Sequence, residues 1–316
     1  MKLSVVIRTL LLCSLGCADR TGREILFAST SDPASDSATI NVFAIRGDGT
    51  GLRQLTHGTK SERTMAVWSP DEKLIAFIAD SANTLATLHL MDPDGSNQRL
   101  LVRLDSMAVS FPDWSPDGSR ILFNASRGAV GPQSPRNVYL VNRDGSGLQP
   151  VLADSSAYGC PTWFPDGQAF LVSSLVHGVS RIVRVTLATR ASEVLITSDS
   201  MWLGCPSVSP DGNRLVFNGS RLPIAPSPVT HAFQMNIYVA NRDGSGFRPL
   251  TTGAMMTNDA RWSRDGRIVV QSNRHAPAAD SPLAALDSLD IYVMNGDGSN
   301  IVRVTTNSRF DGHPSW

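Results

Sequence analysis

The chain has no net charge, few aromatic residues and few long apolar runs. Its 28 Lys and Arg residues balance 28 Asp and Glu residues, so no electrostatic argument favours nucleic acid as a partner. Aromatic residues make up only 7% of the 316 residues, but 41% are hydrophobic, which is enough for a large core and excludes a disordered chain. No stretch is apolar over the length of a transmembrane helix, which excludes a membrane-spanning body.

The first 17 residues carry an apolar run that is too short to cross a bilayer. A basic start precedes this run at 9–15, and Gly16 and Cys17 follow it, an order typical of an export signal. A small residue before a cysteine resembles a bacterial lipoprotein signal, in which Cys17 would carry the lipid. Ser14 stands where that signal prefers leucine, so an ordinary secretory signal is the alternative. Either signal predicts a soluble domain in the periplasm or outer envelope, and the first predicts a lipid anchor as its only contact with the membrane.

Two short phrases alternate along the rest of the chain. The first places a tryptophan before Ser-Pro-Asp-Gly and an apolar run, as in VSFPDWSPDGSRILF from Val109. Copies recur at spacings of 45 to 54 residues, beginning at Ala66, Pro161, Pro206 and Ala260, with a last copy ending at Trp316. The second phrase is built around Asp-Gly-Ser, as in NVYLVNRDGSGLQPVL from Asn137. Repeats of this length are typical of propellers and other arrays.

Each period contains four short apolar or β-branched runs. Pro-Asp-Gly separates the first pair of runs and Asp-Gly-Ser the last pair, and both place Gly where a tight hairpin turn needs positive φ. The runs are apolar on both faces, as expected for sheets packed between two neighbours. Four antiparallel strands repeated six times predict an all-β fold, a six-bladed β-propeller of four-stranded blades.

The two ends of the chain complement each other. The first strand, REILFAST from Arg23, has no tryptophan strand before it, and no strand follows Trp316. We therefore expect the C-terminal strand to pair with the N-terminal blade and close the ring. The predicted domains are a signal peptide over 1–17, a short tether over 18–23 and the propeller over 24–316.

The repeated WSPDG and IYV-x-N-x-DG phrases resemble the TolB-type propeller repeat over nearly all of the chain from about Arg23 onward. TolB is a periplasmic member of the Tol–Pal envelope system, and its propeller binds peptidoglycan-associated lipoprotein and colicin peptides. It also carries an α/β domain before its propeller, which we do not expect here. The resemblance implies a propeller that binds an envelope protein or peptide segment.

The predicted strand order separates two faces of the propeller. The first strand of each blade runs from an upper face down to the repeat tryptophan, so every tight turn lies on the lower face. Long Pro-rich loops fall on the upper face, beginning at Ser31, Arg127, Arg221 and Arg274. Because long loops on a rigid scaffold commonly carry recognition, we expect partners to bind at the upper face.

The residue three positions before each repeat tryptophan should surround the upper mouth of the channel. The predicted binding residues are His313, Met65, Phe111 and Asp259 from this ring, with Trp202 and Tyr158 from the adjoining connections. Trp202 is the one tryptophan outside the repeat register, so it could offer a flat surface to a peptide or a sugar. A locally packed loop residue is the alternative.

Cys160 and Cys205 occupy the same ring position in adjacent blades. Equivalent cysteines on neighbouring inner strands could form a disulfide in an oxidising compartment if their Cα atoms come within about 7 Å. Two small, separate buried thiols are the alternative.

The histidines and acidic turns give no metal-binding pattern. The histidines predicted for the upper face are His57, His177, His231, His275 and His313, and none has a compact spacing such as His-x-x-x-His. The Asp-rich turns lack the ligand series and closing Glu of a calcium loop, which favours hairpin turns. We therefore predict no metal and no cofactor.

Three functions fit these patterns. We favour a non-catalytic binding or scaffold propeller that engages an envelope protein segment or a glycan across the upper mouth, and so expect no enzyme activity. Asp259 beside His313 suggests an acid and a base, which makes a periplasmic hydrolase or lyase the alternative. A peptidase would need a Gly-x-Ser-x-Gly elbow, which the sequence does not contain. The third possibility is a purely structural module.

Overall fold

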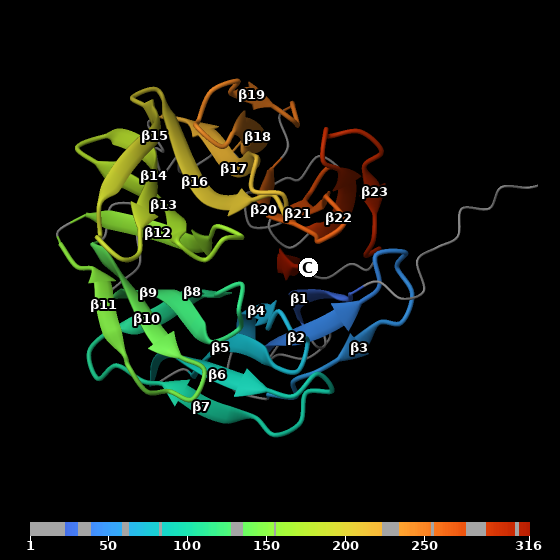
Figure 1. Ribbon diagram of the computed structural model, residues 1–316. Helices are drawn as coiled ribbons and strands as arrows, with labels where there is room; N and C mark the ends of the chain where they lie inside the picture. Colours follow the sequence, from blue (N-terminus) through green and yellow to red (C-terminus); the bar gives the residue numbers. More distant parts are fainter. Residues whose placement is uncertain are drawn as a thin grey trace, which may run out of the picture.

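The computed structural model describes residues 23–30, 39–58, 63–81, 84–127, 135–154, 156–222, 234–253, 256–275, 289–306 and 310–316. These residues form strands and turns, and among them there is no helix that could cross a membrane. The strands are arranged as sheets around a central channel (Figure 1). The predicted signal peptide and nearly all of the predicted tether lie outside the described residues.

Four sheets contain four antiparallel strands each. In order from the channel outward they are β24 (Asp311–Ser315), β1 (Ile25–Thr30), β2 (Ile40–Ile45) and β3 (Arg53–Gln54); β4 (Arg63–Trp68), β5 (Ile75–Ser81), β6 (Thr84–Met91) and β7 (Arg99–Val102); β16 (Met201–Val208), β17 (Arg214–Arg221), β18 (Asn236–Asn241) and β19 (Arg248–Pro249); and β20 (Thr257–Trp262), β21 (Arg267–Ser272), β22 (Asp290–Asn295) and β23 (Val302–Arg303). In the first sheet β24 pairs with β1, with Ser315 opposite Leu26. This pairing confirms the predicted closure by the C-terminal strand.

A fifth sheet contains eight strands. They are β8 (Ala108–Trp114), β9 (Arg120–Ser126), β10 (Arg136–Asn142), β11 (Gln149–Leu152), β12 (Ala157–Trp163), β13 (Ala169–Val176), β14 (Val179–Thr186) and β15 (Ser192–Ser198). A single parallel pair, Arg136 with Ala157, joins β10 to β12. The predicted all-β propeller is confirmed, but the described residues do not give six separate sheets, because this one pair merges two of the expected units.

The hydrophobic core fills the spaces between neighbouring four-strand units. One cluster packs Phe27 and Ile45, from β1 and β2, against Val269 and Ile291, from β21 and β22. Another packs the opposite face of the same sheet, with Leu26, against β4 and β5. Because both faces of a sheet are covered in this way, the strands are apolar on both sides.

Local hydrogen bonds shape the Ser-Pro-Asp-Gly turns. After β8, the hydroxyl of Ser115 donates to Asp117 Oδ1 (2.5 Å) and accepts from the backbone N–H of Arg120 (2.9 Å). Asp117 also accepts from the backbone N–H of Ser119 (3.0 Å). Gly118 has a φ of 69°, which glycine adopts without a Cβ clash. The aspartate of the repeated phrase, here Asp117, therefore stabilises the hairpin turn through these hydrogen bonds.

An arginine lies over each tryptophan that ends an inner strand. The pairs are Arg23 over Trp68, Arg143 over Trp114, Arg120 over Trp163, Arg214 over Trp262 and Arg267 over Trp316, at 4.3 to 5.8 Å from the ring centroid. In four of these pairs, all except Arg143 with Trp114, the arginine and the tryptophan belong to neighbouring units. In three of the four, Arg120, Arg214 and Arg267 each begin the second strand of their unit. These cation–π contacts join neighbouring units on the lower face.

Candidate functional site

Six residues, one from each inner strand, form a ring at the upper mouth of the channel. They are Met65, Phe111, Cys160, Cys205, Asp259 and His313. All six have a positive φ, between 44° and 54°. A left-handed conformation costs a residue with a Cβ roughly 1–2 kcal/mol, so its repetition at every ring position indicates a conformation that the surrounding structure enforces.

A β-bulge in each inner strand produces this conformation. The register between β8 and β9 shifts between Ser110 and Asp113, on either side of Phe111, and equivalent shifts occur in the other inner strands. Pro112 follows Phe111, and three other ring residues also precede a proline, which has no N–H for the ladder. The bulge re-aims the ring side chain toward the channel.

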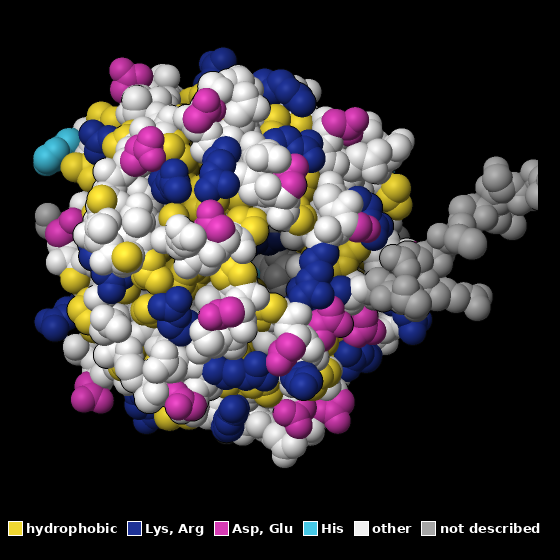
Figure 2. Space-filling model, viewed as in Figure 1, with side chains coloured by type: hydrophobic (Ala, Val, Ile, Leu, Met, Phe, Trp, Pro, Cys, Tyr) yellow, Lys and Arg dark blue, Asp and Glu magenta, His cyan; other side chains and the backbone are white. Residues whose placement is uncertain are grey.

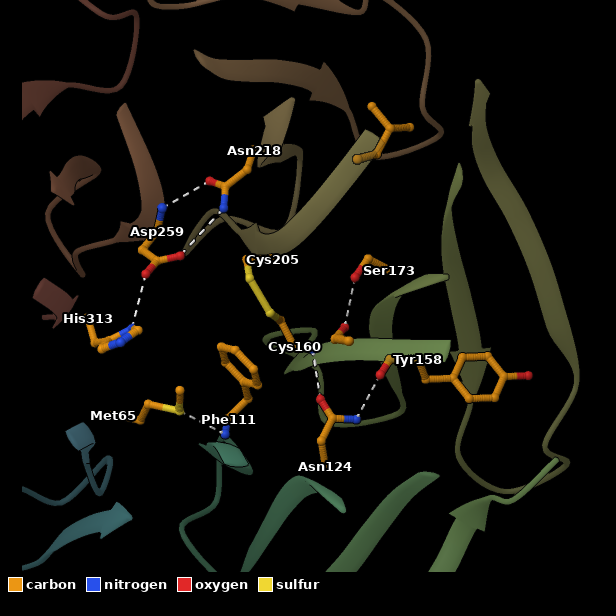
Figure 3. Close-up of a disulfide and its surroundings, with 12 residues drawn as sticks. Met65, Phe111, Asn124, Tyr158, Cys160, Ser173, Cys205, Asn218, Asp259 and His313 are labelled. Atoms are coloured by element: carbon orange, nitrogen blue, oxygen red, sulfur yellow. Dashed lines mark hydrogen bonds and ion pairs between the residues drawn. A yellow bond between two sulfur atoms is a disulfide. The ribbon is translucent and has the colours of Figure 1, made fainter. Parts of the chain in front are cut away.

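Amide side chains from the second strands hold three of the bulges. Asn124 Oδ1 accepts from the N–H of Cys160 (2.9 Å), Asn218 Oδ1 from that of Asp259 (3.0 Å), and Gln271 Oε1 from that of His313 (2.6 Å). Each amide comes from the preceding unit, so it fixes the ring residue of its neighbour (Figure 3). Ring geometry therefore depends on contacts between units.

Asp259 and His313 are neighbours in the ring and bond to each other. Nδ1 of His313 lies 3.1 Å from Oδ2 of Asp259 (Figure 3), and the two side chains are 29% and 15% exposed, respectively. Burial acts to raise the pKa of Asp259, but the hydrogen bond and charge of His313, together with Arg261, outweigh it and hold the pKa below its usual value. The carboxylate is therefore ionised at neutral pH, and Nδ1 of His313 carries the proton that it donates. In the neutral ring, Nε2 is then the proton acceptor.

Cys160 and Cys205 form a disulfide between adjacent inner strands, β12 and β16, with their Cα atoms 4.8 Å apart (Figure 3). Both residues are buried. Of the two arrangements that the sequence left open, the structure has the bonded one, and it links two ring positions covalently.

A cavity of about 230 Å³ opens at the ring. Phe111, Asp259, His313 and Trp202 line this cavity, and Met65 lines a deeper chamber of about 30 Å³. The structure thus brings five of the six predicted binding residues to the upper mouth. Tyr158 is the exception.

Tyr158 and Trp202 both lie within strands, not in the connections where the sequence analysis placed them. The hydroxyl of Tyr158 donates to Asp154 Oδ2 (2.9 Å), and its ring points away from the channel (Figure 3). The ring of Trp202 covers Gly204, where an added Cβ would lie 2.2 Å from the indole. Gly204 leaves room for the indole of Trp202, and this glycine is the feature of the sequence that indicates where the indole lies.

The other histidines do not join the ring. His57 and His177 are exposed, and His275 bonds through Nδ1 to the hydroxyl of Tyr292 (2.7 Å). His231 lies outside the described residues, as do most residues of the long upper loops: 31–38, 128–134, 223–233 and 276–288. Among the residues that the structure describes, no three His, Cys, Asp or Glu side chains gather as metal ligands.

A second, deeper ring was missed by the sequence analysis. It consists of the residues directly before the repeat tryptophans and their valine substitute: Val67, Asp113, Thr162, Ser207, Arg261 and Ser315. These residues line a cavity of about 330 Å³ at the lower mouth, which the repeat tryptophans also line. Figure 2 shows a hollow at the centre of the molecule with hydrophobic side chains around it. The sequence could have indicated this ring, because each of its residues directly precedes a repeat tryptophan or its valine substitute.

Comparison with known proteins agrees with the fold. Residues 75–280 match the family model described as the TolB beta propeller domain. The crystal structure of TolB from Acinetobacter baumannii superimposes with a TM-score of 0.73 at 17% identity, covering 93% of this chain and 66% of that chain. A putative TolB from Agrobacterium tumefaciens gives 0.64 at 20% identity, covering 90% of both chains.

Enzymes share the same propeller. The chain is 30% identical over 185 residues to the "uncharacterized peptidase YuxL" of Bacillus subtilis, a match that covers 58% of this chain and 26% of that protein. A puromycin hydrolase superimposes with a TM-score of 0.57 at 14% identity, covering 90% of this chain and 45% of that chain. An oligogalacturonate lyase in complex with manganese gives 0.56 at 16% identity, covering 84% and 71%.

These matches contradict the expectation that the chain is not an enzyme, because the curated relative is named a peptidase and the structural neighbours include a hydrolase and a lyase. The chain spans about a quarter of the curated relative's length and 66% of the length of the first TolB structure. At their low identities, the solved structures show the shared fold alone.

Proposed function

Because the chain belongs to the TolB β-propeller family, we propose that its upper channel mouth binds a peptide or glycan segment and that Asp259 and His313 act there as the acid–base pair of a periplasmic hydrolase or lyase. The observation that carries this proposal is the 3.1 Å contact between a largely buried carboxylate and an imidazole at the cavity. Acid–base catalysis needs such a base, with a partner that fixes its tautomer.

In this proposal His313 is the base. Its Nε2 takes a proton either from a water that attacks the scissile bond or from a substrate carbon in an elimination. Asp259 orients the ring through Nδ1 and stabilises the imidazolium that forms. Gln271 holds the backbone of His313, and so keeps the ring directed at the cavity. The names of the peptidase, the hydrolase and the lyase support chemistry of this class.

A second function, capture of an envelope protein segment or a glycan across the same mouth, is favoured by the likeness to TolB. The TM-score to TolB, 0.73, exceeds the 0.57 to puromycin hydrolase. A lipoprotein like the peptidoglycan-associated one is the protein partner that this second function suggests.

In both functions we place the protein in the periplasm, with a lipid anchor at Cys17. We also count six blades, by dividing the eight-stranded sheet at its one parallel pair.

The test compares the whole chain with the variants His313→Gln and Asp259→Asn. The substrates are fluorogenic peptide amides, peptidoglycan fragments and acidic oligosaccharides, with elimination followed by the ultraviolet absorbance of the unsaturated product. Loss of general acid–base catalysis should lower turnover by about 10²–10⁴ while binding is retained. The matched control is His57→Gln, because His57 is exposed and lies outside the cavity lining.

Three outcomes separate the two functions. Turnover that survives His313→Gln at its original rate would exclude the acid–base pair. Binding without turnover, lost in Trp202→Ala, would favour capture over catalysis. Neither binding nor turnover on any substrate would overturn both proposals for the upper mouth.

A further inference from the structure

We propose that the lower channel mouth is a second ligand site, which takes a small carboxylate on a flat ring. The proposal does not rest on any reaction at the upper mouth. Its cavity of about 330 Å³ is the larger of the two. Pockets that hold small molecules begin at roughly 300 Å³.

Arg261 supplies the cation of this site. It stands directly before Trp262 in β20 and lines both the lower cavity and the deeper chamber behind the ring. The side chain of Arg261 makes no hydrogen bond or ion pair with any residue that the structure describes, and Asp113 and Asp259 act on it only through their charges. A guanidinium in a partly enclosed cavity is stabilised by an anionic partner, and a carboxylate matches its planar, two-pronged donor geometry.

The tryptophan phrase departs from its pattern beside Arg261. Four copies have a proline two residues after the tryptophan or its substitute, at Pro70, Pro116, Pro165 and Pro210, where this copy has Arg264. Arg264 lines the same cavity, pairs with Glu72 (3.0 Å) and donates to the carbonyl of Pro70. A third cation, Arg23, also lines the cavity. The charged residues of the lining are therefore three arginines and one acid, Asp113.

Flat apolar groups form the walls around these cations. The lining includes all five repeat tryptophans, Trp68, Trp114, Trp163, Trp262 and Trp316, and three prolines, Pro70, Pro116 and Pro165. Indole faces stack against planar rings and against the apolar faces of sugars. Cations within such walls select a ligand that combines a carboxylate with a ring, either aromatic or a sugar ring.

Asp113 opposes the binding of an anion, so replacing it provides a second test of the proposal. Its side chain is partly buried, and its carboxylate accepts a hydrogen bond from the backbone N–H of Trp163 (2.8 Å). Asparagine has nearly the same shape, keeps an acceptor for that N–H and carries no charge. Asp113→Asn should therefore strengthen the binding of a carboxylate, whereas a neutral ligand should be unaffected.

The experiment titrates the whole chain with benzoate by calorimetry, with tryptophan fluorescence as a second readout. Acetate, benzyl alcohol, glucuronate and inorganic phosphate are the comparison ligands. We expect benzoate to bind more tightly than acetate or benzyl alcohol, and Arg261→Gln to weaken it by about tenfold or more, as for loss of a charged hydrogen bond. Asp113→Asn should tighten it, and Arg264→Gln should weaken it.

Two control variants isolate the site. Arg120→Gln removes an arginine that also lies over a repeat tryptophan but outside the cavity lining, so it should leave benzoate binding unchanged. His57→Gln, at an exposed residue outside the linings of both cavities, should also leave it unchanged. Each variant is first shown to be folded by circular dichroism and urea unfolding.

Other results would overturn separate parts of the proposal. Equal binding of benzyl alcohol, or full binding by folded Arg261→Gln and Arg264→Gln, would overturn the role of the cations. Equal binding of acetate would overturn the role of the walls, and equal binding of phosphate would overturn carboxylate selectivity. No binding of either benzoate or glucuronate would overturn the site, and a preference between them identifies the ring as aromatic or saccharide.

Discussion

The indole Nε1 of Trp316 donates a hydrogen bond to the backbone carbonyl of Arg23, 2.6 Å away, across 293 residues of sequence. Arg267 lies 4.3 Å from the centroid of the same indole, and the hydroxyl of Ser315 donates to the carbonyl of Ala66. The ring is therefore closed by side chains as well as by the ladder between β1 and β24. These contacts help to offset the entropy of joining segments that are far apart in sequence.

Replacing Trp316 with alanine should lower the free energy of unfolding by about 2–4 kcal/mol, because it removes partly buried aromatic surface and a cation–π contact. Urea unfolding followed by circular dichroism measures the change. Phe247→Ala is the control, since Phe247 is 41% exposed beside the outer strand β19. If both variants lose the same small amount, closure depends on the strand ladder and not on the indole.

The disulfide makes a second contribution, which depends on the oxidation state. Cys160 and Cys205 are 45 residues apart, and a closed loop of this length stabilises the folded state by at most about 4 kcal/mol through the entropy of the unfolded chain. We expect reductant, or the Cys160→Ala/Cys205→Ala double variant, to lower the free energy of unfolding by about 2–4 kcal/mol. The double variant should no longer respond to reductant. A stability that is equal with and without reductant, with free thiols confirmed by mass, would contradict this assignment.

The repeat made most of the fold predictable, because turn sequences and apolar runs recur at fixed offsets from the tryptophan. Closure at Trp316 followed from the unpaired strands at the two ends of the chain. The link between β10 and β12 was not predictable, since it depends on one parallel pair, Arg136 with Ala157, and not on any pattern of residue types.

The upper ring could be located but not described from sequence. Counting back from the tryptophan found Asp259 and His313, because every inner strand places its bulged residue three positions before the tryptophan or its substitute. Their left-handed backbone was not predictable, since it arises from bulges held by amides such as Asn218 from another unit. Tyr158 was wrongly placed because its position relative to the strand start, and not its residue type, turns its ring outward.

Contact between Trp202 and Gly204 gives a third prediction. An added Cβ at Gly204 would lie 2.2 Å from the Trp202 ring, so Gly204→Ala should displace the indole from the upper cavity and destabilise the fold by about 1–3 kcal/mol. The cost should fall in a Trp202→Ala background, where nothing remains to clash. A double-mutant cycle by urea unfolding measures this coupling. Equal costs in both backgrounds would show that the alanine is opposed by something other than the indole.

Two aspartates should respond to pH in opposite directions. Burial raises the pKa of Asp113 above 3.8, although Arg261 partly offsets this, so its contribution to stability is present in acid and is lost as the pH rises through the folded-state value. Bonds from Ser115 and Ser119 lower the pKa of Asp117 to about 2, so its contribution is present above 3.8 and is lost as the pH falls. Measured by urea unfolding, Asp113→Asn should therefore gain stability relative to the parent as the pH rises from 3.8, whereas Asp117→Asn should lose it from about 2 upward. Parallel pH profiles for the two variants would show that burial does not control the protonation of Asp113.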